Sequence, residues 1–204
     1  MRLIGGCLIA ILLGACTGAS NNVSSYYTFS IPLAQKQSNP AKDSNLVLLL
    51  DQVKVVGVSD QQSLVQLLEH NRVSVAQNNF WAEHPSYMLN KALLASLQND
   101  LPQWQILSAN TPSPTPTPLV LSVEVNELAG HYQNGALISG HWFIYKQTEQ
   151  EKQLLTYKPF VFTTELGDNG FAALVAALQT SWLELAQQIA LELNHYAKNP
   201  NDKD

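Results

Sequence analysis

The sequence has few cysteines, few charged residues and no basic cluster. Of its 204 residues, two are Cys and 13% are charged, and the net charge is −5. Two cysteines cannot form a disulfide framework. Nucleic acid is excluded as a partner because binding to phosphates needs clustered cations, which this acidic chain does not have. The lack of a lysine- or arginine-rich run also argues against a basic membrane-binding surface.

Apolar residues, by contrast, are abundant, at 46% of the chain. A chain with this content can bury a core that offsets the entropy lost on folding, so it is not a disordered protein. The length suits one domain with at most a small extension.

The N-terminus has the layout of an export signal. Arg2 precedes an apolar run from Leu3 to Leu13, which is too short to cross a bilayer as a permanent helix. The run leads into Leu13-Gly14-Ala15-Cys16, which resembles the lipobox of bacterial lipoproteins, where the cysteine is acylated and the chain is cut before it. We therefore expect a lipoprotein signal peptide over residues 1–15 and lipidation of Cys16. The alternative is a plain signal peptide with a chance cysteine.

The acyl chains would anchor the protein, because each buried methylene contributes about 0.8 kcal/mol. Cys7 follows almost no apolar run and leaves with the signal. Position 17 is Thr, whereas Asp there usually retains similar lipoproteins in the inner membrane. The expected location is thus the periplasmic face of the outer membrane. Residues 16–25 are polar and are predicted to form an acylated tether, which spans at most about 30 Å.

Hydrophobic periodicity predicts a folded domain over residues 26–198 and a short tail over 199–204. Its first half contains one helix, which begins at Pro85 and carries leucines at four-residue spacing until Pro102 ends it. Loop is expected at 35–44. Strands are expected at 26–32, at 46–58 as one central strand, at 64–68 and 72–78 around a turn, and at 103–108.

The second half begins with alternating prolines at 111–118, which favour a stiff connector over a ligand for a partner domain. Residues 119–126 have the alternating pattern of a strand, with the side chains at odd positions expected to face the core. Asn134-Gly135 predicts a two-residue hairpin that returns through 136–146. A third strand over 153–164 contains Pro159, which favours an edge. Asp168 is predicted to cap a long helix over 169–196. Together the elements predict an α+β fold: a mainly antiparallel sheet with two amphipathic helices packed on one face.

No catalytic constellation rises above chance. Phosphate-binding glycine loops and nucleophile elbows are absent, and His70, His84, His131, His141 and His195 lack metal-ligand spacing. The expected hairpin places His131 opposite Ile138 and His141 opposite Leu128, so the two histidines do not meet.

The adjacent Glu83 and His84 form no acid–base pair, because neighbouring residues in an extended segment point to opposite sides. Trp81 is interpreted as a core aromatic rather than a ligand platform. The sequence therefore predicts no catalytic residue, no metal and no cofactor, and favours binding or assembly over enzymatic activity.

Several segments together resemble the ABC-type transport auxiliary lipoprotein family, of the PqiC-like kind. They are the lipobox, Tyr26-Tyr27, the apolar Val55-Val56-Gly57-Val58, Phe80-Trp81-Ala82-Glu83 directly before a helix, and the terminal helix from Phe171. The resemblance covers about Tyr26 to Tyr196. Relatives usually carry an apolar residue where this chain has His84-Pro85, and the proline-rich segment is peculiar to it.

The resemblance implies lipid transport between the inner and outer membranes, in a membrane-integrity system built around MCE-domain proteins that form an apolar tunnel. It implies an MCE-domain membrane protein as partner, a docking or capping role at that tunnel, and a homo-oligomeric ring. Trp81 and Glu83 would form a structural or partner-contacting motif. The alternative function is an envelope-assembly lipoprotein, a chaperone for an outer-membrane barrel or for lipopolysaccharide export.

Overall fold

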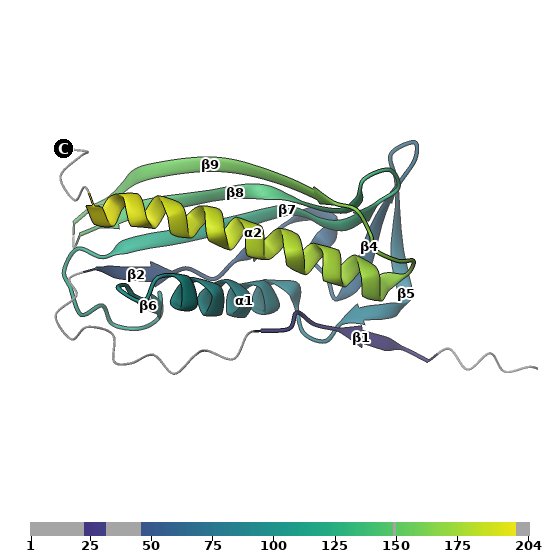
Figure 1. The fold of residues 1–204 in the computed structure, drawn as a ribbon, viewed down its shortest axis with the longest axis horizontal. Coiled ribbons are helices and arrows are strands. Elements are labelled where there is room, and N and C mark those ends of the chain that lie inside the picture. Colours follow the sequence, from purple (N-terminus) through teal and green to yellow (C-terminus); the bar gives the residue numbers. More distant parts are fainter. Residues whose placement is uncertain (1–22, 32–45, 149, 199–204) are drawn as a thin grey trace, which may run out of the picture.

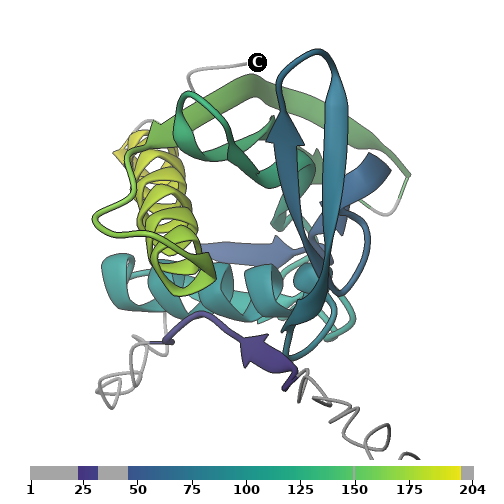
Figure 2. The same ribbon diagram turned by 90° about the vertical axis from the view of Figure 1, so that its right-hand side faces the viewer.

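The computed structural model describes residues 23–31, 46–148 and 150–198. The predicted signal peptide, Cys16, most of the tether, the loop at 35–44 and the tail at 199–204 lie outside the described residues. The described chain is α+β, with two α-helices and a sheet that curls around the core (Figures 1 and 2). The elements are β1 (Ser25–Tyr27), β2 (Val47–Leu50), β3 (Lys54–Val55), the 3-10 helix η1 (Gly57–Ser59), β4 (Ser63–Leu68), β5 (Arg72–Trp81), α1 (Pro85–Asp100), β6 (Gln105–Ser108), β7 (Leu119–His131), β8 (Gly135–Gln147), β9 (Lys152–Thr164) and α2 (Phe171–Lys198).

Strand β7 is the central strand of the sheet and has partners on both sides. On one side it pairs antiparallel with β8, which pairs antiparallel with β9. On its other side it pairs in turn with β2, β3 and β4, all parallel. Strand β2 continues to β6 in parallel, while β4 continues to β5 antiparallel and β5 to β1 in parallel. The α+β class with two helices is confirmed, but the expectation of a mainly antiparallel sheet is wrong. The sheet is mixed because β2, β3 and β4 run in the same direction as β7, whereas β8 runs in the opposite direction.

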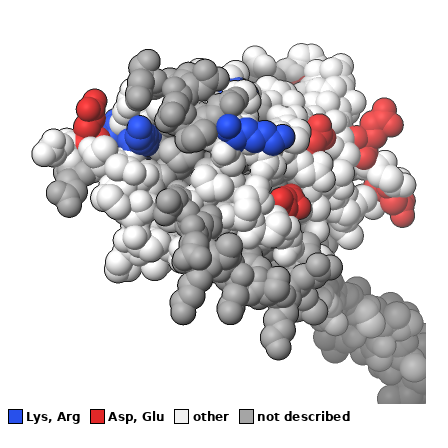
Figure 3. All heavy atoms as spheres, turned by 60° about the vertical axis from the view of Figure 1, so that its left-hand side comes forward, with Lys and Arg blue, Asp and Glu red and all other residues white. Residues whose placement is uncertain are grey.

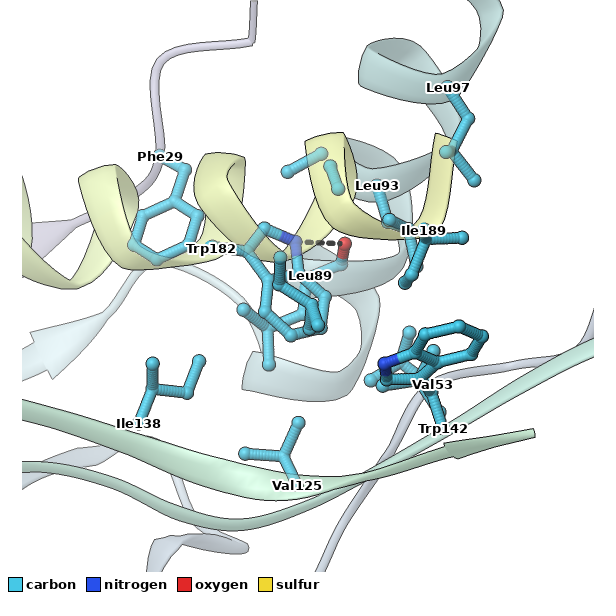
Figure 4. Packing of buried hydrophobic residues seen from close by; sticks show 14 of the residues in the cluster. Phe29, Val53, Leu89, Leu93, Leu97, Val125, Ile138, Trp142, Trp182 and Ile189 are labelled. Carbon is cyan, nitrogen blue, oxygen red and sulfur yellow. Dashed lines mark hydrogen bonds between the residues drawn. The ribbon is translucent and has the colours of Figure 1, made fainter. Parts of the chain in front are cut away.

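One large hydrophobic core contains side chains from both helices and from the sheet (Figure 4). Leucines of α1 at four-residue spacing are fully buried in it, as the periodicity predicts. The indole N–H of Trp182 on α2 donates a hydrogen bond to the carbonyl oxygen of Leu89 on α1 over 3.1 Å. This bond ties the two helices together inside the core. That both helices pack on a single face of the sheet stays a prediction.

The predicted single strand over 46–58 is wrong, because the chain breaks into β2, β3 and η1. The backbone N–H of Val53 leaves the sheet and donates to the side-chain oxygen of Asn90 on α1, over 3.2 Å. Gly57 then adopts a left-handed conformation, with φ of 69°, which glycine tolerates without strain. The polar pair Asp51-Gln52 marks the first break and faces partly or fully toward solvent.

The hairpin between β4 and β5 is confirmed, with His70 and Asn71 at positive φ in its turn. The hairpin between β7 and β8 exists, but its predicted register is wrong. His131 pairs with Gly135, so the loop has three residues, and Gly135 supplies the left-handed conformation (φ 73°) that such loops need. The imidazole Nδ1 of His131 accepts hydrogen bonds from the N–H groups of Gln133 and Asn134 and stabilises this loop.

A bulge between Val125 and Glu127 shifts the register of β7 further, so His141 lies opposite Glu124 rather than Leu128. The conclusion that His131 and His141 do not meet still holds. Before the bulge, the odd positions of β7 face the main core, as predicted; after it, Leu128 does.

Helix α2 begins at Phe171, so the prediction of Asp168 as its N-cap is also wrong. The carbonyl of Gly170 (φ 99°) accepts the hydrogen bond from Leu174 N–H, while the Asp168 carboxylate accepts one from the neighbouring Asn169 N–H.

Candidate functional site

The Phe80–Glu83 motif is a structural junction. Trp81 ends β5 with 1% of its surface exposed, and its ring meets that of Phe29 edge-on, with centroids 5.9 Å apart. Its backbone N–H donates to the carbonyl of Gln62 over 2.7 Å, and the N–H of Ala82 donates to the carbonyl of Tyr27 over 2.8 Å. These bonds join β1 and the segment before β4 to the end of β5. Trp81 is a core residue, and no partner can reach it in this conformation.

Glu83 and His84 have separate partners within the fold. The Glu83 carboxylate forms an ion pair with Lys91, which lies in the second turn of α1. The Nδ1 atom of His84 accepts a hydrogen bond from Ser86 N–H over 3.4 Å and so caps α1, while its Nε2 atom lies 3.3 Å from Asp60. Hence His84-Pro85, the departure from the family pattern, begins the helix. The motif positions β1 and the start of α1.

The remaining histidines are dispersed. His70 lies in the β4–β5 turn, His131 stabilises the β7–β8 loop, His141 is on β8, and His195 is in the last turn of α2. Within the described residues, no group of three or more His, Cys, Asp or Glu side chains could hold a metal ion. Within the same ranges, neither helix combines the length and apolar character of a membrane span.

The outward face of β8 and β9 carries apolar and aromatic side chains. We call it the outer strip, and it runs across both strands in register: Tyr145 opposite Leu154, Phe143 opposite Tyr157, and His141 opposite Pro159, with Val161 beyond. Leu154 is 51% exposed, Tyr157 52% and Val161 69%. The opposite face of these strands contributes Ile144, Trp142 and Phe160 to the core.

The rings of the outer strip are ordered against one another. The Lys152 ammonium lies 4.4 Å from the centroid of the Tyr145 ring. The ring centroids of Tyr145 and Phe143 are 6.0 Å apart, and those of Phe143 and Tyr157 are 5.3 Å apart. The centroids of Tyr157 and His141 are 5.4 Å apart. Distances of this size are those of favourable aromatic pairs, so the strip is held in place before any partner binds.

A polar groove of about 570 Å³ adjoins the outer strip and shares Phe143, Tyr145 and Lys152 with it. It lies where the parallel strands β2 and β6 end. In it the Asp51 carboxylate accepts a hydrogen bond from Ser122 and lies 3.5 Å from the Lys152 ammonium. Among the described residues, the end of the molecule near β2, β6 and the end of α2 shows a few charged side chains with uncharged surface between them (Figure 3). Because the groove and the strip share Phe143, Tyr145 and Lys152, they form one mixed surface with an apolar part and a polar margin.

Two carboxyl groups have shifted pKa values of opposite sign. Partial burial alone would raise the pKa of Glu192, but the hydrogen bond and charge of Lys158, at 2.7 Å, together with Thr156 and His195, lower it below its ordinary value. Burial raises the pKa of Glu127. Its Oε2 atom has no hydrogen-bond partner among the described residues. Both shifts follow from structural surroundings rather than from a reactive cluster.

Two solved structures share this fold. An uncharacterised protein superimposes with a TM-score of 0.70 and 25% identity, covering 84% of this chain and 99% of its own. Protein XCC0632 from Xanthomonas campestris superimposes with a TM-score of 0.64 and 13% identity, covering 86% of this chain and 99% of its own. The class is thus an α+β domain whose architecture recurs over nearly the whole length of its structural relatives.

The sequence pattern described as ABC-type transport auxiliary lipoprotein component matches residues 27–190, and the chain belongs to this family. Over 186 residues it is 27% identical to the intermembrane transport lipoprotein PqiC of Escherichia coli K12, spanning 91% of this chain and 94% of that protein. PqiC of Shigella flexneri matches equally. The resemblance recognised from the sequence is confirmed.

The outer strip was not among the surfaces predicted from the sequence. The sequence does contain an indication of it, because apolar residues occupy both the odd and the even positions of 153–164. Tyr157 and Val161 are at odd positions, and Phe160 and Phe162 are at even positions. A strand with one solvated face should alternate apolar and polar residues. Apolar residues on both faces of an edge strand indicate a surface with a further contact.

Proposed function

We propose that this chain is the outer-membrane lipoprotein subunit of an MCE-type intermembrane phospholipid transport system, where it docks or caps the periplasmic tunnel. The observation that carries the proposal is family membership over residues 27–190, together with similarity along 94% of a protein named as an intermembrane transport lipoprotein.

The lipobox supports a membrane anchor at Cys16, with the signal over 1–15 removed and the tether over 16–25 leading into the domain. Val23 is the first described residue. Six residues lie between it and Cys16, and the seven steps from Cα to Cα, at about 3.5 Å each, reach at most about 25 Å. The domain over 26–198 would thus stay close to the bilayer. Thr17, in place of Asp, favours the outer membrane.

In this function the subunit acts by contact. Phospholipids move through the lumen of the MCE-domain partner, so this chain needs no catalytic residue, metal or cofactor for the step. A homo-oligomeric ring would match the symmetry of a tubular partner. Trp81 and Glu83 would contribute by holding β1, the strand nearest the tether, against β5 and α1.

Crosslinking in intact envelopes tests the proposal. The full-length chain with a C-terminal affinity tag is crosslinked, extracted with detergent and isolated. We expect an MCE-domain protein among the crosslinked products. Repeated isolation without any MCE-domain protein would contradict the proposal.

A deletion strain separates this function from the alternative of envelope assembly. We expect altered phospholipid distribution between the two membranes, with normal barrel proteins and lipopolysaccharide. Defective barrel or lipopolysaccharide levels with normal phospholipid distribution would favour the assembly chaperone instead.

A further inference from the structure

The outer strip departs from what a solvated sheet face normally carries. Antiparallel strands that cover a core on one side usually present polar side chains on the other. Here the outward positions from Leu154 to Val161 on β9, and their β8 neighbours Tyr145 and Phe143, are apolar or aromatic. Contiguous apolar surface of this kind marks an interaction site, whereas single exposed apolar residues do not.

The geometry of β9 favours contact through its face over contact through its edge. Within the described sheet, β9 pairs with β8 and lies at the end of the β7–β8–β9 arm. Pro159, at the middle of the strand, has no N–H to donate and interrupts the row of edge hydrogen bonds. Strand addition along the whole edge is thereby disfavoured. The outward side chains remain available.

The position of the strip relative to the N-terminus determines which partner it can meet. Figures 1 and 2, which share a vertical axis, both place β9 on the side of the molecule opposite β1. The chain that leads from Cys16 joins the domain just before β1, and it is at most about 25 Å long. A lipid anchor therefore draws the β1 side toward the membrane. The outer strip then faces away from that membrane, toward the periplasm.

We propose that the outer strip is the surface on which this subunit binds its protein partner, through an apolar patch on that partner. This inference rests on the proposed function, in which the partner is the tunnel-forming component that reaches across the periplasm. The strip supplies an apolar centre, and the adjoining groove with Asp51, Ser122 and Lys152 supplies a polar margin. An apolar centre with a polar rim is the usual composition of a protein–protein interface.

A photo-crosslinking experiment in cells tests this assignment. The photoreactive amino acid p-benzoylphenylalanine replaces Tyr157 or Val161 in the full-length chain. The control positions are Tyr87 on α1, which is 60% exposed, and Leu191 on α2, which is 71% exposed. Since all four side chains are exposed, none of the replacements should prevent folding. Under ultraviolet light we expect p-benzoylphenylalanine at position 157 or 161 to crosslink to an MCE-domain protein. The same residue at the two control positions should give about tenfold less of this crosslinked product.

Other outcomes overturn the assignment. Links from the strip to a second copy of the chain would make it a subunit interface, and links to lipid would make it a membrane-facing surface. If the MCE-domain protein is recovered with the chemically crosslinked parent chain but not from the strip positions, the proposed function stands and the strip assignment fails. If it is not recovered in either experiment, both fail.

A pair of charge substitutions gives an independent measure. Val161→Glu places a carboxylate at the end of the strip, on a side chain more exposed than Leu154 or Tyr157, and Leu191→Glu places one at a similarly exposed position on α2. We expect Val161→Glu to reduce co-isolation of the partner about tenfold or more, as loss of an interface hot spot does. Leu191→Glu should leave it unchanged. Equal recovery with both variants would contradict the assignment, provided that both chains unfold at the parent's temperature.

Discussion

Gly140 on β8 lies where no side chain fits, which gives a sharp test of the β7–β8 register. A Cβ atom added there would lie 2.0 Å from the carbonyl oxygen of Glu124 and 2.9 Å from the ring of Phe160. The first neighbour is backbone of β7 just before the bulge, and the second is a buried ring from β9. Neither can yield without moving a strand, so Gly140→Ala should open the centre of the sheet.

The expected cost is about 3 kcal/mol of unfolding free energy. Overpacking a filled core costs about 1–3 kcal/mol, and each ladder hydrogen bond lost as β7 and β8 separate adds about 1 kcal/mol. For a chain of this size, 1 kcal/mol corresponds to about 2–4 °C in Tm. The Tm of Gly140→Ala should therefore fall by about 6–12 °C.

The assay is urea and thermal unfolding of the purified chain, followed by tryptophan fluorescence. Gly167→Ala is the matched control, because a Cβ there has no atom within 4 Å and φ is not positive. Its effect should stay within about 0.5 kcal/mol. If the two variants unfold at the same urea concentration, the register and the bulge described above are incorrect.

Three further predictions concern the helix contact and the two shifted carboxyl groups. Trp182→Phe removes the bond to the Leu89 carbonyl and leaves a cavity, so it should cost about 2–3 kcal/mol in urea unfolding; a change under about 0.5 kcal/mol would refute the helix contact. Glu192→Gln should lower Tm at neutral pH, since a lowered folded-state pKa gives stability that is lost as pH falls. Glu127→Gln should raise Tm at neutral pH, because burial disfavours its carboxylate. Both differences should vanish in acid, where the carboxyls are protonated; differences that persist there would contradict the assigned shifts.

Features that depend on local sequence could be predicted. The four-residue leucine spacing predicted α1, because a helix buries one stripe whatever it packs against. Pro85 marked its start, and the turn after β4 followed from the polar Glu69-His70-Asn71. The lipobox is likewise a local signal, since the sulfur must follow the apolar run directly, and lipidation of Cys16 stays a prediction.

Features that depend on distant residues could not be predicted. The break after β2 follows from a bond to Asn90 on α1, 37 positions away. The register of β7 and β8 depends on a bulge and on the His131 side chain in the loop, neither of which changes the hydrophobic pattern. Residues 153–164 carry apolar side chains on both alternating sets of positions, but only the folded sheet shows which set faces the core and which set forms the outer strip.

Attachment by acyl chains on Cys16 is the premise of the proposed membrane anchor and of the orientation of the outer strip, because it sets the side on which β1 meets the membrane. Mass spectrometry of the N-terminal peptide, prepared from the protein in its native envelope, tests it directly. We predict a peptide that begins at Cys16 and carries the mass of three acyl chains, and that Cys16→Ala abolishes. An unmodified N-terminal residue at any position would contradict the anchor and the orientation derived from it.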